Sequence, residues 1–216
     1  MDAAPVPVDI DNGSCGEQIR FTGEYVDWDN DATFCGINDA LIEVVGGSMD
    51  GTAPNGRFDL CIPDAPTTRV DITQPTATSQ CTVPPSTYTI PTILVANKAV
   101  IQSGAFYSGR SFTTMRQTSF FTMVGAAFDP TKAQVVVHVD GIPRTVALAA
   151  AHGTAQAIMA TAWAPGAAGH EVFFPNVDVG SGTTTLTMDG FVLGTGAIPL
   201  VAGTITNVTL NSYPTN

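Results

Sequence analysis

The sequence predicts an all-β protein, and three observations support that prediction. Apolar and polar residues alternate with a period of two over short stretches, as expected for strands that are buried on one face. Gly, Pro and Asn separate these stretches, and these residues favour tight turns. Charged residues make up only 12% of the 216 residues, so the chain lacks the Glu- and Lys-rich stretches from which surface helices form.

Four strands are expected in the first third of the chain, at 18–26, 40–45, 57–62 and 67–73. Each stretch alternates between apolar and polar side chains. The turn Pro54-Asn55-Gly56 precedes the third strand, because Pro fixes φ and Asn-Gly accepts a positive φ. Strands with one buried face need a partner sheet, so this segment predicts a β-sandwich.

A second module is expected after residue 130. A chain of 216 residues is long enough for two domains of about 100 residues each. Most of the 19 acidic residues precede residue 72, and this asymmetry also indicates two modules. The strand pattern returns at 134–140, 145–150, 156–163, 171–177, 183–189, 197–201 and 204–210.

One short helix is expected between the two modules. Apolar residues recur at helical spacing over Ser111–Phe128, Ser111 can cap the first turn, and Asp129-Pro130 ends the pattern. The Phe and Met stripe is interpreted as core packing. The expected organisation is a flexible or docking N-terminal arm at 1–14, a disulfide-linked sandwich at 15–98, a connector with the helix at 99–130 and a second sandwich at 131–216.

The first module resembles a known family. Phe21–Asp27, Ile37–Val44 and Thr52–Leu60 are similar to the strand, strand and hairpin pattern of the carboxypeptidase regulatory-like domain, a transthyretin-like sandwich. In the second module, Phe174–Gly180 resembles a turn of transthyretin-like and Cna-B-like domains. The resemblance implies two tandem transthyretin-like sandwiches of Greek-key, immunoglobulin-like type. It also implies an accessory or assembly module, and it supplies no catalytic residues.

The cysteines predict two disulfides. All four lie in the first 81 residues without a Cys-x-x-Cys pair, which disfavours zinc ribbons and redox motifs. If the four strands of the first module alternate in direction, two cysteines lie at each end of the sandwich. The predicted disulfides are therefore Cys35–Cys61 and Cys15–Cys81.

Charge and composition predict an extracytoplasmic protein. The net charge of -11 repels nucleic acid and anionic lipid. The chain has no run of about 18 apolar residues that could span a bilayer. The Asp-, Ala- and Pro-rich residues 1–7 resemble the tethers of bacterial lipoproteins. We expect a bacterial protein that is secreted or surface-tethered and that meets the membrane only through a lipid tether.

Two groups of side chains are candidate metal ligands. Asp27, Asp29 and Asp31 alternate in one loop, and clustered oxygens suit a calcium ion as cofactor. The alternative is an acid-rich solvated turn, because Ala32 and Thr33 depart from the EF-hand pattern.

The three histidines, His138, His152 and His170, are candidate ligands for zinc or copper. Their spacing matches no ligand motif, so isolated surface or core histidines are the alternative interpretation.

No catalytic motif is present in the sequence. Gly46–Asp50 departs from Gly-x-Ser-x-Gly because it ends in Asp. Lys132 together with Asn207 or Asn211 occupies positions that form an isopeptide bond in Cna-B-like domains, with Glu171 as the candidate acid.

The sequence therefore favours a non-catalytic binding, adhesion or assembly module. A protein partner or a second copy is expected to meet it at sheet edges. Two alternatives stay open: a secreted hydrolase or metalloprotein that uses the His-bearing loops of the second module, and a carbohydrate-binding module with a polysaccharide partner. Trp28 and Trp163 are the only tryptophans, and the sequence reveals no aromatic platform for a sugar.

Overall fold

The computed structural model describes residues 15–28, 35–76, 85–158, 162–192 and 197–212. Strands make up 49% of the structure and helices 9%, so the predicted all-β class is confirmed. Neither helix in these ranges is long and apolar enough to cross a membrane. The helices are α1 (Lys98–Gln102) and α2 (Thr114–Met123).

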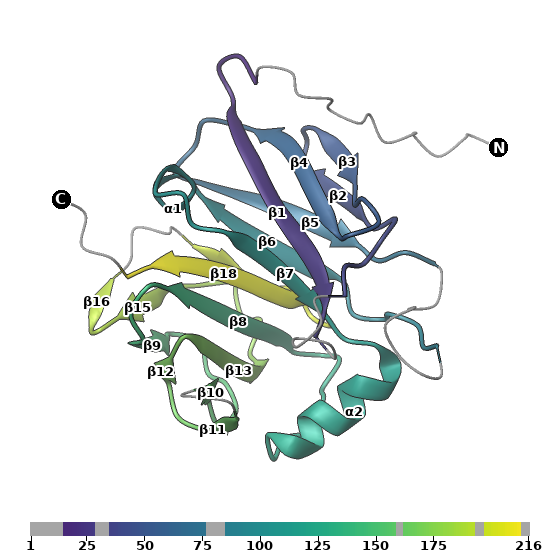
Figure 1. Cartoon of the computed structure of the whole chain (residues 1–216). Helices are drawn as coiled ribbons and strands as arrows, with labels where there is room; N and C mark the ends of the chain where they lie inside the picture. Colours follow the sequence, from purple (N-terminus) through teal and green to yellow (C-terminus); the bar gives the residue numbers. More distant parts are fainter. Residues whose placement is uncertain (1–14, 29–34, 77–84, 159–161, 193–196, 213–216) are drawn as a thin grey trace.

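A nine-stranded sheet runs through both halves of the chain (Figure 1). The last strand, β18, lies between β6 and β8 and is parallel to both. The order across the sheet is β11 (Trp163–Pro165), β10 (Gln156–Ile158), β13 (Glu171–Val177), β8 (Ala133–Asp140), β18 (Ile205–Asn211), β6 (Thr92–Asn97), β5 (Thr67–Thr73), β2 (Leu41–Val44) and β3 (Met49–Gly51).

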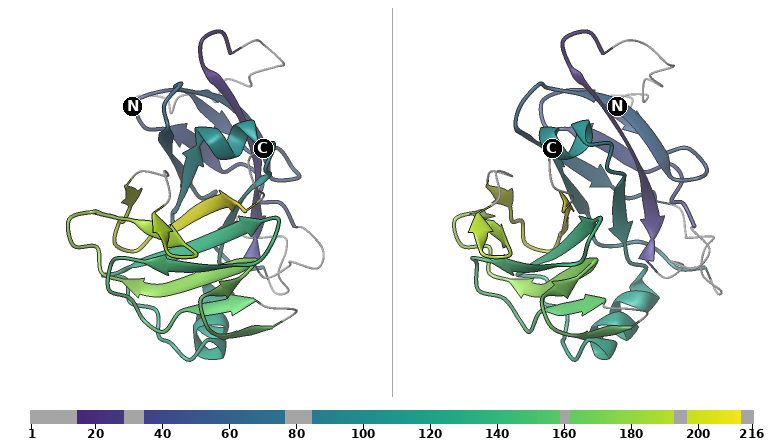
Figure 2. Two further views of the ribbon diagram at one scale, coloured as in Figure 1. Left: turned by 90° about the vertical axis from the view of Figure 1, so that its left-hand side faces the viewer. Right: turned by 60° about the vertical axis from the view of Figure 1, so that its left-hand side comes forward.

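Smaller sheets cover the two halves of this large sheet (Figure 2). The first half packs against three strands in the order β4 (Arg57–Ile62), β1 (Ile19–Asp27) and β7 (Tyr107–Ser111). The second half packs against four short strands in the order β12 (Ala168–Gly169), β9 (Arg144–Leu148), β15 (Leu186–Met188) and β16 (Phe191–Val192). A further pair is formed by β14 (Thr183–Thr184) and β17 (Ile198–Pro199).

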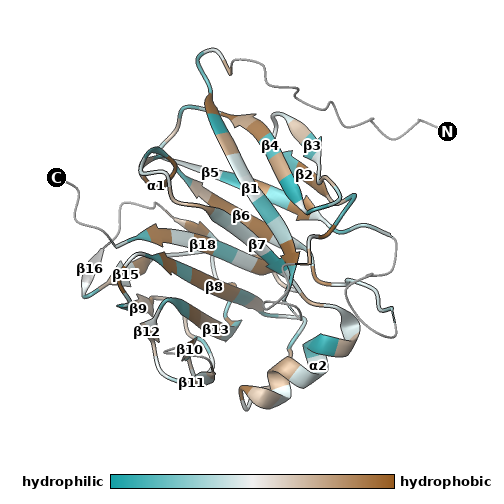
Figure 3. Ribbon diagram, viewed as in Figure 1, coloured by the Kyte–Doolittle hydropathy of each residue, from teal (hydrophilic) through white to brown (hydrophobic). Residues whose placement is uncertain are grey.

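The two covering sheets pack on opposite faces of the large sheet. On β6, Leu94 and Ala96 belong to the core of the first half, while Val95 belongs to the core of the second half. Successive side chains of a strand point to opposite faces, so β6 contributes to both cores. Apolar residues predominate on β6 and β8 (Figure 3).

A third apolar cluster joins the two halves. Helix α2 buries Phe120 and Phe121 against Trp28, which follows β1, and against Phe173 of β13. The helix is the one predicted from the sequence, but its N-cap is Thr113, whose hydroxyl accepts a hydrogen bond from the Arg116 amide.

The predicted tandem transthyretin-like arrangement is not confirmed. The expected connector contains β7, which pairs with β1 in the first sandwich. The expected second module supplies β18, which pairs with β6 of the first. The two halves therefore share one sheet.

This shared sheet predicts a single unfolding transition. Separating the halves would expose the edges of β6 and β18 and the aromatic cluster around Trp28. We expect differential scanning calorimetry to give one peak, with a ratio of calorimetric to van't Hoff enthalpy of about 1. Two resolved peaks would show that the halves unfold independently and would contradict the prediction.

The structure contradicts both predicted disulfides, because Cys15 is bonded to Cys61 across a Cα–Cα distance of 5.5 Å. The sequence analysis missed the short strand β3 between β2 and β4. This extra strand reverses the direction of β4, so β4 runs antiparallel to β1 and Ile62 lies opposite Ile19. Cys35 also takes part in a disulfide, whereas Cys81 lies outside the described residues.

Candidate functional site

The structure describes one of the three predicted calcium ligands, Asp27. Asp27 is buried at the end of β1, where its carboxylate accepts a hydrogen bond of 2.6 Å from the Tyr88 hydroxyl. Asp29 and Asp31 lie outside the described residues. Of the three aspartates, the structure therefore describes only Asp27, and its carboxylate is already hydrogen-bonded to Tyr88.

The three histidines do not converge. The ring of His152 is exposed and meets Phe174 edge-on at 4.8 Å, on the face of the large sheet that packs into the second core. His138 points to the opposite face, as the alternation of β8 predicts. His170 is exposed between β12 and β13. Among the described residues, no group of three or more His, Cys, Asp or Glu side chains could hold a metal ion.

Instead, His138 belongs to a polar cluster in which Glu171 and Asn207 are buried and His138 and Arg110 are partly buried. The strand register builds the cluster, because Glu171 of β13 lies opposite His138 of β8. Asn207 is on the neighbouring strand β18, two residues before the register partner of His138. Arg110 reaches the cluster from β7, and its Nε atom lies 3.2 Å from Oε1 of Glu171.

Burial controls the electrostatics of this cluster. The side chain of Glu171 is 8% exposed and that of Arg110 is 17% exposed. Burial lowers the pKa of His138, and the nearby positive charge of Arg110 lowers it further, so the imidazole is neutral at pH 7. Arg110 also lies over Trp28, with its guanidinium carbon 5.8 Å from the ring centre, which is a cation–π distance.

The space enclosed by the cluster is too small for an organic substrate. It has a volume of about 10 Å³, which is room for about one water molecule. The side-chain amide nitrogen of Asn207 is buried against this space and has no hydrogen-bond partner among the described residues. The cluster therefore fastens β7 of the outer sheet to β13 and β8 of the large sheet.

The structure also contradicts the predicted isopeptide bond. The ammonium group of Lys132 binds the carboxylate of Asp178. Asn207 lies opposite Val136 on β8, four residues beyond Lys132, which corresponds to about 13 Å along a strand. Asn211 is farther still, because it lies opposite Asp140.

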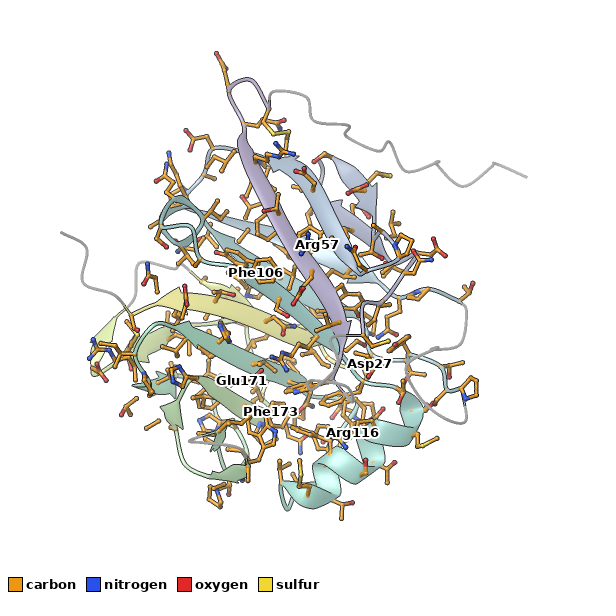
Figure 4. The ribbon with its side chains drawn as sticks, in the orientation of Figure 1. Asp27, Arg57, Phe106, Arg116, Glu171 and Phe173 are labelled. Atoms are coloured by element: carbon orange, nitrogen blue, oxygen red, sulfur yellow. A yellow bond between two sulfur atoms is a disulfide. The ribbon has the colours of Figure 1, made fainter. Side chains whose placement is uncertain are left out.

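A larger open depression lies on the outer face of β1 and β4, and we call it the Phe106 groove. Figure 4 labels two of its residues, Phe106 and Arg57. Its volume is about 440 Å³. Its lining includes Thr22 of β1, Asp50 of β3, Arg57 and Asp59 of β4, and Phe106, which directly precedes β7.

The register of β1 and β4 places the polar side chains of this groove. Thr22 lies opposite Asp59, and Glu24 lies opposite Arg57. Two hydrogen bonds of 2.9 and 3.0 Å join the Arg20 Nε atom to the Asp59 carboxylate. Arg57 makes no ion pair with any residue that the structure describes. Its guanidinium group is exposed, and its charge acts on Glu24 across the strand pair.

Glu24 connects the groove to the polar cluster. Its carboxylate lies 3.5 Å from the Ser108 hydroxyl, and Ser108 also lines the space beside Arg110. Burial raises the pKa of Glu24, and the hydrogen bond from Ser108 and the charges of Arg57 and Arg110 oppose that rise. Polar side chains thus form a row from the groove on the outer sheet to His138 on the large sheet.

We expect His138 to make folding stability depend on pH. Its pKa in the folded state is below the usual value of about 6.5, so the unfolded chain takes up the proton first as the pH falls. The free energy of unfolding then decreases below about pH 6.5, by at most about 1.4 kcal/mol per pH unit. Other charged groups near His138 are Arg110, Asp140, His170 and Glu171.

This pH dependence can be measured by urea unfolding between pH 5 and 7 for the wild type and for His138→Gln. The variant should show the shallower slope, and His152→Gln, which changes an exposed histidine, should retain the wild-type slope. Equal slopes for the wild type and His138→Gln would show that His138 is not the responsible group.

The sequence analysis does not identify Arg110 of the polar cluster, nor Arg57 and Phe106 of the Phe106 groove. Arg110 lies in the segment that was interpreted as a connector, although Tyr107–Ser111 alternates with a period of two as a strand does. Arg57 was interpreted only as part of a hairpin. Phe106 has no local pattern that marks it as exposed, and its 51% exposure is visible only in the structure.

Comparison with protein-family models, with curated proteins and with solved structures finds no match to this chain. The resemblance to carboxypeptidase regulatory-like domains therefore remains a prediction, and the function is argued from the geometry alone.

Proposed function

We propose that this chain is a non-catalytic binding module that works outside the cytoplasm and holds its partner in the Phe106 groove. One contrast carries the proposal. Among the described residues, the cluster of Arg110, His138 and Glu171 is best suited to acid–base chemistry, but it lines a space of only about 10 Å³. The Phe106 groove has a volume of about 440 Å³ and contains a half-exposed aromatic ring. Binding sites are typically open or concave regions of about 300 to 1,000 Å³ that combine apolar surface with a few polar groups.

The state of the polar cluster supports a non-catalytic role. Arg110 and Glu171 neutralise each other at 3.2 Å. His138 keeps a lowered pKa, but it faces a space that admits about one water molecule. A general acid or base must come within hydrogen-bond reach of its substrate, and the space that these side chains line is too small for a substrate to enter.

The edges of the large sheet are less suitable for partner binding than the sequence suggests. The strands at the two ends of the large sheet, β3 and β11, have three residues each. Short edge strands present few free backbone groups to an added strand. This observation favours the groove over strand addition at the large sheet.

The disulfide supports the proposed location. The Cys15–Cys61 bond is compatible with an oxidising compartment. Secretion or surface tethering of a bacterial protein is part of the proposal.

The proposal can be tested by co-sedimentation of the purified chain with washed bacterial cell-envelope material. We expect the wild type to sediment and Phe106→Ala to lose at least about tenfold in affinity, since truncating an anchoring aromatic typically costs 2 kcal/mol or more. Val45→Ala is the matched control, because Val45 is also an exposed apolar residue but does not line the groove. Equal sedimentation of the wild type and Phe106→Ala would overturn the proposal. Turnover of an ester, peptide or glycoside substrate that depends on Glu171 would also overturn it.

A further inference from the structure

We propose that the Phe106 groove binds a short stretch of a neutral polysaccharide. This inference rests on the proposed function, because it names the class of ligand for the same groove.

The aromatic ring of Phe106 is the first reason. Among the large apolar side chains that the structure shows as exposed, Phe106 is the aromatic one, and it is 51% exposed. The face of an aromatic ring carries partial negative charge. It therefore attracts the weakly positive C–H groups on the apolar face of a sugar ring. A flat sugar ring can therefore stack on the exposed ring of Phe106, and this contact requires no charge on the sugar.

The polar side chains of the groove are the second reason. Sugar hydroxyls both donate and accept hydrogen bonds, and the groove supplies both functions. Arg57 presents guanidinium N–H donors with no ion-pair partner among the described residues, and Thr22 presents an exposed hydroxyl. The carboxylate of Asp59 binds Arg20 but has further lone pairs that can accept from a ligand.

The balance of charge favours a neutral ligand over an anionic one. Asp50 is buried, and its two oxygens accept hydrogen bonds from the backbone amides of Gly51 and Asp59. The charge of Asp59 is neutralised by Arg20, and that of Glu24 is opposed by Arg57. The groove thus lacks the surplus positive charge that an anionic polymer needs, and the net charge of -11 on the whole chain repels such a polymer.

The position of the groove disfavours an extended peptide. Peptides commonly bind by adding a strand to the free edge of a sheet. Strand β1 is the central strand of its sheet, and both of its edges already pair with β4 and β7. Strand β4, which also lines the groove, is an edge strand, but its Arg57 and Asp59 amides donate to the side chains of Asn55 and Asp50. No free backbone ladder of β1 remains for a peptide.

Isothermal titration calorimetry with defined oligosaccharides tests this inference. The probes are cello-, malto-, manno- and xylo-oligosaccharides, with oligogalacturonate as the anionic counterpart. We expect at least one neutral series to bind and oligogalacturonate to bind at least about tenfold more weakly at low salt. Phe106→Ala should weaken the neutral interaction at least about tenfold, Phe106→Trp should retain it, and Val45→Ala should not change it. Equal melting temperatures for the wild type and Phe106→Ala would confirm that the variant is folded.

Two results would overturn the inference. One is the absence of binding to all four neutral series, and the other is preferential, salt-sensitive binding of oligogalacturonate. If either result appears while sedimentation with the cell envelope still depends on Phe106, the proposed function stands and only the class of ligand is wrong. If sedimentation does not depend on Phe106, the proposed function fails as well.

Discussion

Replacement of Arg110 by Met lowers the free energy of unfolding by about 3 to 5 kcal/mol, because it removes the positive charge that lies 3.2 Å from the buried carboxylate of Glu171. Met keeps most of the aliphatic length of the side chain, so the change chiefly removes charge. It also removes the cation–π contact with Trp28. Guanidinium chloride unfolding at pH 7, followed by tryptophan fluorescence and circular dichroism, measures the effect.

Two further variants separate the charge effect from a loss of packing. Arg20→Met breaks the exposed pair with Asp59 and should have a much smaller effect, because solvent screens exposed ion pairs. Adding Glu171→Gln to Arg110→Met should restore part of the lost stability, since Gln carries no charge at this buried position. Equal effects of Arg110→Met and Arg20→Met would show that the Arg110–Glu171 pair does not fasten the two sheets.

Removal of the Cys15–Cys61 disulfide is expected to lower the free energy of unfolding by about 4 kcal/mol. The two cysteines are separated by 46 positions, and the loop-entropy model gives about this value for a loop of that length. The variant Cys15→Ala/Cys61→Ala, unfolded in guanidinium chloride, measures the loss. A change below about 1 kcal/mol would contradict the entropic account of this bond.

The connectivity itself can be checked by non-reducing peptide mapping. A peptide containing Cys15 should be linked to one containing Cys61, as the geometry requires. Recovery of Cys61 linked to Cys35 would support the pairing expected from the sequence and would contradict the register of β1 and β4.

The strands were largely predictable from the sequence, because their signal is local. The alternation in 18–26, 57–62 and 67–73 anticipates β1, β4 and β5, since the side chains at positions i and i+2 share a face. The three-residue strand β3 was missed because Met49–Gly51 is too short to show a period. Because β3 is left out, the sequence predicts the wrong direction for β4. The two disulfides derived from that direction are therefore wrong as well.

The candidate site was predictable only in part. The sequence indicates His138 as a metal ligand, and Asn207 and Glu171 as parts of an isopeptide bond. It does not indicate that the three residues form one cluster. They meet because β8 pairs with β13 on one side and with β18 on the other. Their charged partner, Arg110, comes from a strand of a different sheet, and nothing in the sequence near Arg110 indicates that contact.

The sequence by itself determined the all-β class, most of the strands, helix α2 and the charge that disfavours anionic partners. These properties depend on composition and on neighbours a few positions apart. Only the tertiary structure decided that β18 lies between β6 and β8, that Arg110 binds Glu171 and that Phe106 stays exposed above a groove. Alternation specifies which face of a strand is buried, but it does not specify which distant strand lies beside it, because many pairings bury the same face equally well.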